Sequence, residues 1–157
     1  MREYLNVRCG ALALLCVCFG CESPVVSDVA EFSDLHPVTG RVTLDGKPIP
    51  GGSVRLFPAG TGASAGSADV HSAVVRDDGT FEVRTFRAGG QGIGAPAGDY
   101  LVSVSWTGHP SIDTDIPRDE LPELLPAKYT RPQTSRLEAK VVPGGTVLPE
   151  FELDESP

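Results

Sequence analysis

The sequence predicts an all-β fold: a seven-stranded antiparallel β-sandwich with long loops and one short helix. Two observations predict it. From residue 37 onward, apolar and polar residues alternate with a period of two in seven short segments. The 157 residues also include 18 glycines and 14 prolines, which favour frequent turns over long helices. Because no helical pattern alternates with the strand segments, parallel βαβ units are not expected.

Each expected strand is bounded by residues that favour turns. The strands cover residues 38–44, 54–57, 73–75, 80–84, 100–106, 137–142 and 147–153. Asp45-Gly46 and Asp78-Gly79 are typical of tight turns, since Asp and Gly accept the positive φ that such turns need. Tyr100 and Trp106 stand on the longest apolar face, so we expect them to make the largest contributions to the core.

Three insertions separate the strands. Residues 60–72 are rich in Gly, Ala and Ser, residues 86–98 are rich in Gly, and residues 107–134 form the longest insertion. The segment 86–98 is expected to be a flexible loop, because glycine restrains the backbone so little. Within the longest insertion, residues 117–125 are expected to form one or two helical turns that end at Pro126.

The N-terminus has the order of an export signal, which is positive, then apolar, then small. Arg2 and Arg8 precede the apolar run 11–19, which is about half of the ~20 residues that a helix needs to span a bilayer. Gly20-Cys21 resembles the end of a bacterial lipoprotein signal, in which the cysteine is acylated after cleavage on its amino side. The resemblance implies a diacylglyceryl anchor on Cys21, which binds a membrane stably. Simple cleavage near this position is the alternative.

These segments divide the chain into three parts. We expect a lipoprotein signal peptide at 1–20, a flexible acidic tether at 21–36 and the β-sandwich domain at 37–157. The four cysteines lie between residues 9 and 21, so the expected domain depends on packing and sheet hydrogen bonds rather than disulfides. The expected location is exported and lipid-anchored in the bacterial cell envelope, periplasmic or at the outer membrane.

Several strand-and-turn motifs resemble a known family. Val38-Thr-Gly-Arg-Val-Thr-Leu-Asp-Gly-Lys-Pro-Ile-Pro, Val54-Arg-Leu-Phe-Pro and Asp78-Gly-Thr-Phe resemble the carboxypeptidase regulatory-like domain, whose β-sandwich is transthyretin-like, of the prealbumin type. Three later motifs resemble a set of small exported lipoproteins abundant in planctomycete bacteria. They are Ala95-Pro-Ala-Gly-Asp-Tyr, Leu125-Pro-Ala-Lys-Tyr and Thr134-Ser-Arg-Leu. The resemblance covers about residues 38–153. It implies a fold and no catalytic residues, since the molecular function of that group is largely unassigned.

The sequence contains no pattern of catalytic, metal-ligating or cofactor-binding residues. His36, His71 and His109 lie far apart, and none has Glu three residues later, as an HxxE zinc motif would need. The net charge of −8 argues against nucleic-acid binding, which needs a basic footprint. An acidic group in the long insertion is interpreted as a solvated face, with adventitious divalent-ion binding as the alternative. Its members are Asp113, Asp115, Asp119, Glu120 and Glu123.

The leading functional hypothesis is a non-catalytic, lipid-anchored envelope module that binds or organises another envelope protein or a glycan. Its contact surfaces are expected in the loops around Gly60, Gly90 and Ser111, because loops on a rigid sandwich commonly carry binding. The sequence does not predict an oligomeric state.

Two alternatives belong to other classes. One is an envelope hydrolase that uses His71 or His109 with acidic loop residues. The other is a glycan-binding module, which would display aromatic side chains as platforms. The candidates for such platforms are Phe57, Phe86 and Tyr129.

Overall fold

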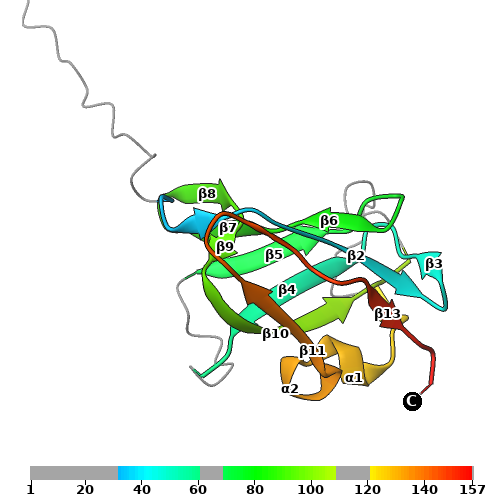
Figure 1. Ribbon diagram of the computed structural model, residues 1–157. Helices are drawn as coiled ribbons and strands as arrows, with labels where there is room; N and C mark the ends of the chain where they lie inside the picture. Colours follow the sequence, from blue (N-terminus) through cyan, green and yellow to red (C-terminus); the bar gives the residue numbers. More distant parts are fainter. Residues whose placement is uncertain (1–31, 61–68, 109–120, 157) are drawn as a thin grey trace, which may run out of the picture.

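The computed structural model describes residues 32–60, 69–108 and 121–156, and it confirms an all-β sandwich (Figure 1). The strands are β1 (Leu35–His36), β2 (Val38–Leu44), β3 (Lys47–Pro48), β4 (Ser53–Pro58), β5 (Val70–Val74), β6 (Thr80–Glu82), β7 (Arg84–Arg87), β8 (Gly90–Ile93), β9 (Ala95–Pro96), β10 (Gly98–Ser105), β11 (Leu137–Val141), β12 (Thr146–Val147) and β13 (Phe151–Leu153). Two short helices, α1 (Ala127–Thr130) and α2 (Pro132–Ser135), lie between β10 and β11 in the sequence.

One layer is a six-stranded sheet in the order β11-β10-β4-β5-β7-β8. Every neighbouring pair in it is antiparallel. The longest strand, β10, pairs with β4 from Tyr100 to Ser105 and with β11 from Gly98 to Val102. Both helices contact β10, and the Ser135 hydroxyl donates to the carbonyl of Val102, the last residue of β10 that pairs with β11.

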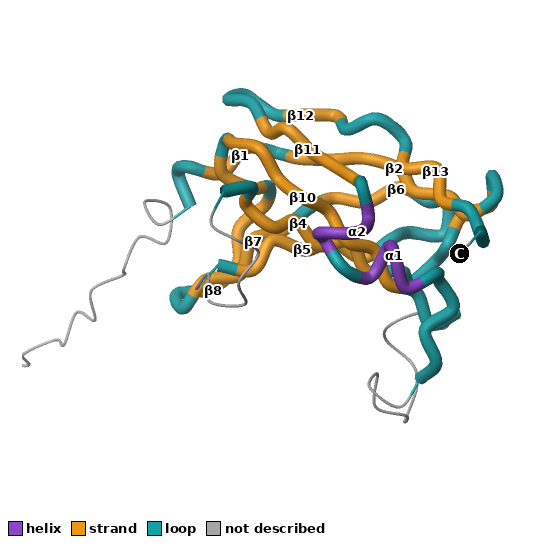
Figure 2. The backbone as a smooth tube through the Cα atoms, turned by 90° about the horizontal axis from the view of Figure 1, so that it is seen from below, coloured by secondary structure: helices purple, strands orange, loops and turns teal. Residues whose placement is uncertain are grey.

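The second layer is built around β2. It pairs antiparallel with β3 and β6, and in parallel with β12 and β13. The sequence gives no sign of this parallel pairing, which becomes possible because almost the whole domain connects β2 to β12. The expected strand 147–153 is divided in two, with Pro149 between the pieces, since proline has no N–H for the ladder. Figure 2 shows the two layers from below.

The core lies between the two layers. Phe81 is fully buried, and its ring stacks on Phe151 with 6.2 Å between centroids. Gly40 stands opposite Phe81, where a Cβ atom would lie 2.5 Å from the ring. Tyr100 is buried as expected, whereas Trp106 packs half-buried against the core and donates its indole N–H to the Pro50 carbonyl at 3.0 Å.

The helical prediction for 117–125 is wrong in the part that the structure describes. Residues 121–126 are not helical, and the helices begin at Ala127 and Pro132. Pro126 precedes α1 rather than ending a helix. Proline is tolerated at the start of a helix, where its missing N–H would have no partner in any case.

The prediction of a flexible loop at 86–98 is also wrong. This segment forms a hairpin of β7 and β8, followed by β9, which pairs with β1. Gly92 allows Phe32 and Leu35 to pack onto the hairpin, because a Cβ there would come within 2.7 Å of both side chains. Residues 32–36, expected at the end of the tether, therefore lie against the sandwich. The rest of the predicted tether and the signal peptide lie outside the described residues.

Candidate binding face

Strands β4, β5 and β7 send alternate side chains to opposite sides of the six-stranded sheet, as the period of a strand requires. On β5, His71 and Ala73 are buried against the second layer, while Val70 and Val74 are 46% and 50% exposed. The side that carries Val70 and Val74 is called the outer face. It is the surface of the sheet that points away from the second layer.

An apolar row crosses the outer face. Leu101 pairs with Phe57, and Val70 pairs with Phe86. In the antiparallel ladder of β4 and β5, Leu56 pairs with His71, so Phe57 stands opposite Val70. The two pairs therefore lie side by side. Phe86 is 42% exposed. The rings of Phe57 and Phe86 thus stand two strands apart, roughly 10 Å between their backbones.

An arginine row runs beside the apolar row on the same face. Arg55 pairs with Ser72 on one side, and Arg84 pairs with Ser72 on the other. Both arginines are exposed, and neither makes an ion pair or hydrogen bond with another residue of the described ranges. Two cations therefore flank one hydroxyl across three adjacent strands.

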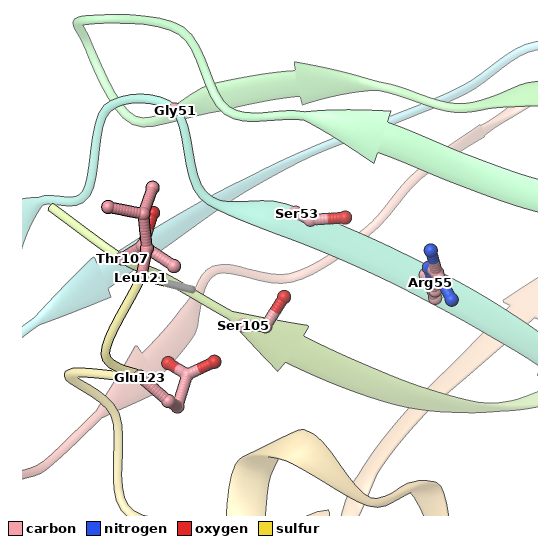
Figure 3. Close-up of a pocket in the computed structure, with 7 residues that line it drawn as sticks. All are labelled: Gly51, Ser53, Arg55, Ser105, Thr107, Leu121 and Glu123. Carbon is pink, nitrogen blue, oxygen red and sulfur yellow. The ribbon is translucent and has the colours of Figure 1, made fainter. Parts of the chain in front are cut away.

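Two shallow hollows mark this face. The larger, of about 330 Å³, is lined by Gly51, Ser53, Arg55, Ser105, Thr107, Leu121 and Glu123 (Figure 3). The smaller, of about 180 Å³, is lined by Ser72, Ala73, Val74, Arg76, Glu82, Arg84 and Phe86. Because Arg55 and Ser72 are a register pair, the hollows adjoin. The hydroxyls and guanidinium groups that line them supply hydrogen-bond donors and acceptors to a polar ligand.

The two glutamates in these hollows are already engaged. Oε1 of Glu123 accepts hydrogen bonds from the backbone N–H groups of Trp106 at 2.8 Å and Leu125 at 3.0 Å. Glu82 lies 3.9 Å from Arg76. The hydrogen-bond donors that remain for a ligand are the guanidinium groups of the arginine row and the hydroxyl groups that line the hollows.

The opposite side of β5 and β7 is a closed polar cluster. The Thr85 hydroxyl donates to the Gly94 carbonyl at 2.7 Å, so its oxygen accepts from Nδ1 of His71, also at 2.7 Å. The His71 ring meets Tyr100 edge-on, 5.6 Å between centroids. Burial lowers the pKa of His71 and raises the pKa of Tyr100 to about 12. This imidazole is held neutral inside the sandwich and lines neither hollow on the outer face.

Arg87 fastens the N-terminal segment to this cluster. Its guanidinium donates two hydrogen bonds to Asp34 and one to Asp69, all at 2.8 Å, and lies 5.6 Å from the centre of the Phe32 ring. The bonds to Arg87 lower the pKa of Asp34. The arrangement fixes residues 32–36 beside the β7–β8 hairpin.

Several residues singled out in the sequence lie outside the described part of the chain. They are Cys21, His109, Ser111, Asp113, Asp115, Asp119 and Glu120. Their assignments remain predictions. Of the three expected contact loops, Gly90 lies in the β7–β8 hairpin and Gly60 ends the described part of its loop.

The remaining candidates have structural partners. Nδ1 of His36 accepts from the Gly144 N–H at 3.4 Å. Tyr129 is buried, with its hydroxyl bonded to Asp154. Of the three aromatic candidates, only Phe57 and Phe86 therefore share an accessible face. Residues two apart in a strand share a face, so alternation in the sequence puts Arg55 on the face of Phe57 and Arg84 on the face of Phe86. This pattern could have added both arginines to the candidate binding residues.

Among the described residues, no group of three His, Cys, Asp or Glu side chains could hold a metal ion. No helix within the described ranges has the length and hydropathy to cross a membrane. A further hollow of about 570 Å³ lies at α1, where Lys128 is bonded to Asp154 at 2.8 Å.

The fold and this face define an all-β sandwich module with an aromatic and polar sheet surface. No family model matches the sequence, and no curated protein matches it. Among solved structures, a DUF3823 family protein from Parabacteroides merdae ATCC 43184 is similar at 15% identity, with a TM-score of 0.32. The match covers 76% of this chain and 44% of that chain, so this chain spans less than half of that protein's length.

Proposed function

We propose that this protein is a non-catalytic module of the bacterial cell envelope that binds carbohydrate through its outer face. The observation that carries the proposal is the apolar row, with an exposed Phe86 and a partly exposed Phe57, beside a row of hydrogen-bonding groups that the described fold leaves without partners. An exposed apolar patch rimmed by polar residues typically marks a binding site.

The chemistry of the two rows fits a sugar. The faces of aromatic rings carry partial negative charge, so they attract the C–H groups on the face of a pyranose. The hydroxyls of a sugar need donors and acceptors close to that ring, and Ser72 and Arg84 lie beside Phe86 in the smaller hollow. The separation of Phe57 and Phe86 suits an oligosaccharide, because successive sugar rings could stack along the row.

The envelope part of the proposal rests on the sequence. The export signal at 1–20 and the acylated Cys21 would place the sandwich just off a membrane, as a lipoprotein of the carboxypeptidase regulatory-like type. Radiolabelled palmitate should enter the wild-type protein and Cys18→Ser, and should not enter Cys21→Ser. Equal labelling of Cys21→Ser would contradict the anchor.

Binding is tested with a glycan array, followed by calorimetry on any sugar that binds. Phe86→Ala should weaken binding about tenfold, because loss of one ring contact removes about 1.4 kcal/mol. Phe86→Tyr should retain binding, since it keeps the ring. Phe86→Leu keeps apolar area without a ring and should lose it, which separates sugar stacking from general hydrophobic contact.

Val147→Ala is the matched control. Val147 is 83% exposed on β12, in the other layer, and its loss should leave binding unchanged. A blank array would overturn the proposal, and so would equal binding by Phe86→Ala and the wild-type protein.

A further inference from the structure

The lining of the two hollows differs in the sign of its charge from the chain as a whole. The chain has 13 Lys and Arg against 21 Asp and Glu, a net charge of −8. The two hollows are lined by Arg55, Arg76 and Arg84 against Glu82 and Glu123, so they carry a small positive excess. A lining with this sign of charge favours a negatively charged ligand over a positively charged one.

The excess is concentrated in the arginine row. Arg76 already has Glu82 at 3.9 Å and the Thr80 hydroxyl at 3.4 Å. Glu123 directs one carboxylate oxygen to two backbone N–H groups. Arg55 and Arg84 remain, and their planar guanidinium groups can bind a carboxylate or sulfate through paired hydrogen bonds.

The arginine row lies where the substituents of a stacked sugar would reach. Arg84 and Phe86 are two residues apart on β7, with side chains on the same face, roughly 7 Å apart along the strand. Arg55 and Phe57 have the same relation on β4. Each ring of the apolar row is therefore accompanied by one guanidinium, at a distance that an exocyclic group of a pyranose can bridge.

We infer that the carbohydrate bound by the outer face is an anionic polysaccharide, with uronate carboxylates or sulfate esters held by Arg55 and Arg84. This inference rests on the proposed function, since the sugar rings would stack on Phe57 and Phe86. The repeat of ring and guanidinium on two strands favours a polymer with recurring charges over a single small anion.

The test compares matched polymers by calorimetry with the exported part of the chain. Polygalacturonate is paired with its carboxyl-reduced form, and dextran sulfate is paired with dextran. At least one anionic polymer should bind about tenfold more tightly than its neutral partner, and added salt should weaken that advantage through screening. The pair that shows the advantage identifies the anionic group as carboxylate or sulfate.

Charge-removing variants complete the test. In the double variant Arg55→Gln and Arg84→Gln, the affinities for the anionic polymer and its neutral partner should become equal, because the anionic advantage depends on the two guanidinium groups. Lys47→Gln removes an exposed cation from β3 in the other layer and should change neither.

The outcomes separate the inference from the function on which it rests. Equal binding of anionic and neutral polymers would overturn the inference and leave carbohydrate binding in place. An anionic preference that survives the double variant would also overturn it, because other residues would then hold the charge. No binding to any polymer would overturn both.

Discussion

The two faces of β5 and β7 are built from alternate residues of the same strands and differ in how their polar groups are used. On the inner face, His71, Thr85 and Arg87 are joined to neighbours by hydrogen bonds of 2.7–2.8 Å. On the outer face, Arg84 has no partner in the described ranges and Phe86 is 42% exposed.

The two faces therefore differ in how much their polar side chains contribute to the stability of the fold. Buried polar groups must be paired, because leaving one unpaired costs free energy, so the inner cluster is explained by folding alone. Exposed arginines and an exposed ring contribute little to folding. Their arrangement in two rows is the feature on which the proposed carbohydrate binding depends. The following variants test the difference between the faces, in order of expected effect.

Gly94→Ala should give the largest loss of stability. Gly94 has φ of +99°, and a Cβ atom would lie 2.0 Å from the carbonyl oxygen of His36. Backbone strain and overpacking each cost about 1–3 kcal/mol, so chemical denaturation should show a loss of about 3 kcal/mol or more.

Gly60→Ala is the control for Gly94→Ala. Gly60 has a similar φ of +101°, and a Cβ there would meet no atom of the described residues within 4 Å. It should lose about 1–2 kcal/mol from strain alone. Equal losses at the two glycines would contradict the close approach of the N-terminal segment.

Thr85→Val should destabilise the protein by about 1–3 kcal/mol, because it leaves the His71 Nδ1–H and the Gly94 carbonyl unpaired at almost constant volume. Arg84→Gln, one residue earlier on the outer side, should change the free energy of unfolding by no more than about 0.5 kcal/mol. Similar losses for the two variants, measured by urea denaturation, would remove the distinction between the faces.

Acid should destabilise the inner face through His71. Burial lowers the pKa of His71 in the folded protein below its ordinary value of 6.5. The negative charges of Asp69 and Asp34 partly oppose this shift, whereas the positive charge of Arg87 adds to it. Well above pH 6.5 the His71 imidazole is neutral in both the folded and the unfolded protein. Below it the unfolded state binds a proton first, so the free energy of unfolding should fall by up to about 1.4 kcal/mol per pH unit.

The control for this pH dependence is His71→Asn, which can still donate a hydrogen bond toward Thr85 but does not titrate. Its stability should fall less steeply between pH 6.5 and 5 than that of the wild-type protein. Parallel curves for the two proteins would show that other groups cause the acid sensitivity.

Phe86→Ala should have the smallest effect on stability, within about 0.5 kcal/mol, because Phe86 is 42% exposed and surface substitutions usually change the free energy of unfolding little. Thermal melts of this variant and the wild-type protein should nearly coincide. A loss above 2 kcal/mol would mean that Phe86 is a packing residue, and the apolar row would then need no ligand.

The strands could be predicted from the sequence because their alternation is local. The strands expected at 38–44, 54–57, 100–106 and 137–142 match β2, β4, β10 and β11 to within two residues, as the period of two predicts. The expected strand 80–84 is wrong as a single strand, because it is divided between β6 and β7, which lie in different sheets. The β7–β8 hairpin could not be predicted, because Gly92 is fixed by Phe32 and Leu35, which lie more than fifty residues away in the sequence. The prediction that Pro126 ends a helix is wrong, because proline can precede a helix as well as end one, and α1 begins directly after Pro126.

The candidate site was predictable only in parts. Phe57 and Phe86 stand out as isolated aromatics, but their common row depends on the order β4-β5-β7, which places strands from distant segments side by side. Tyr129 also stands out in the sequence as an isolated aromatic residue, but it is buried. Alternation assigns Arg55 and Arg84 to the faces of their aromatic neighbours, yet nothing local shows that both arginines lack partners.

The most direct test measures stability and glycan affinity together for Thr85→Val and Phe86→Ala, neighbours on β7 that point to opposite faces. The account predicts that Thr85→Val loses about 1–3 kcal/mol of stability and, at a temperature where it is folded, binds as the wild-type protein does. It predicts that Phe86→Ala keeps its stability and binds about tenfold more weakly. Unchanged binding by Phe86→Ala, or weakened binding by both folded variants, would contradict it.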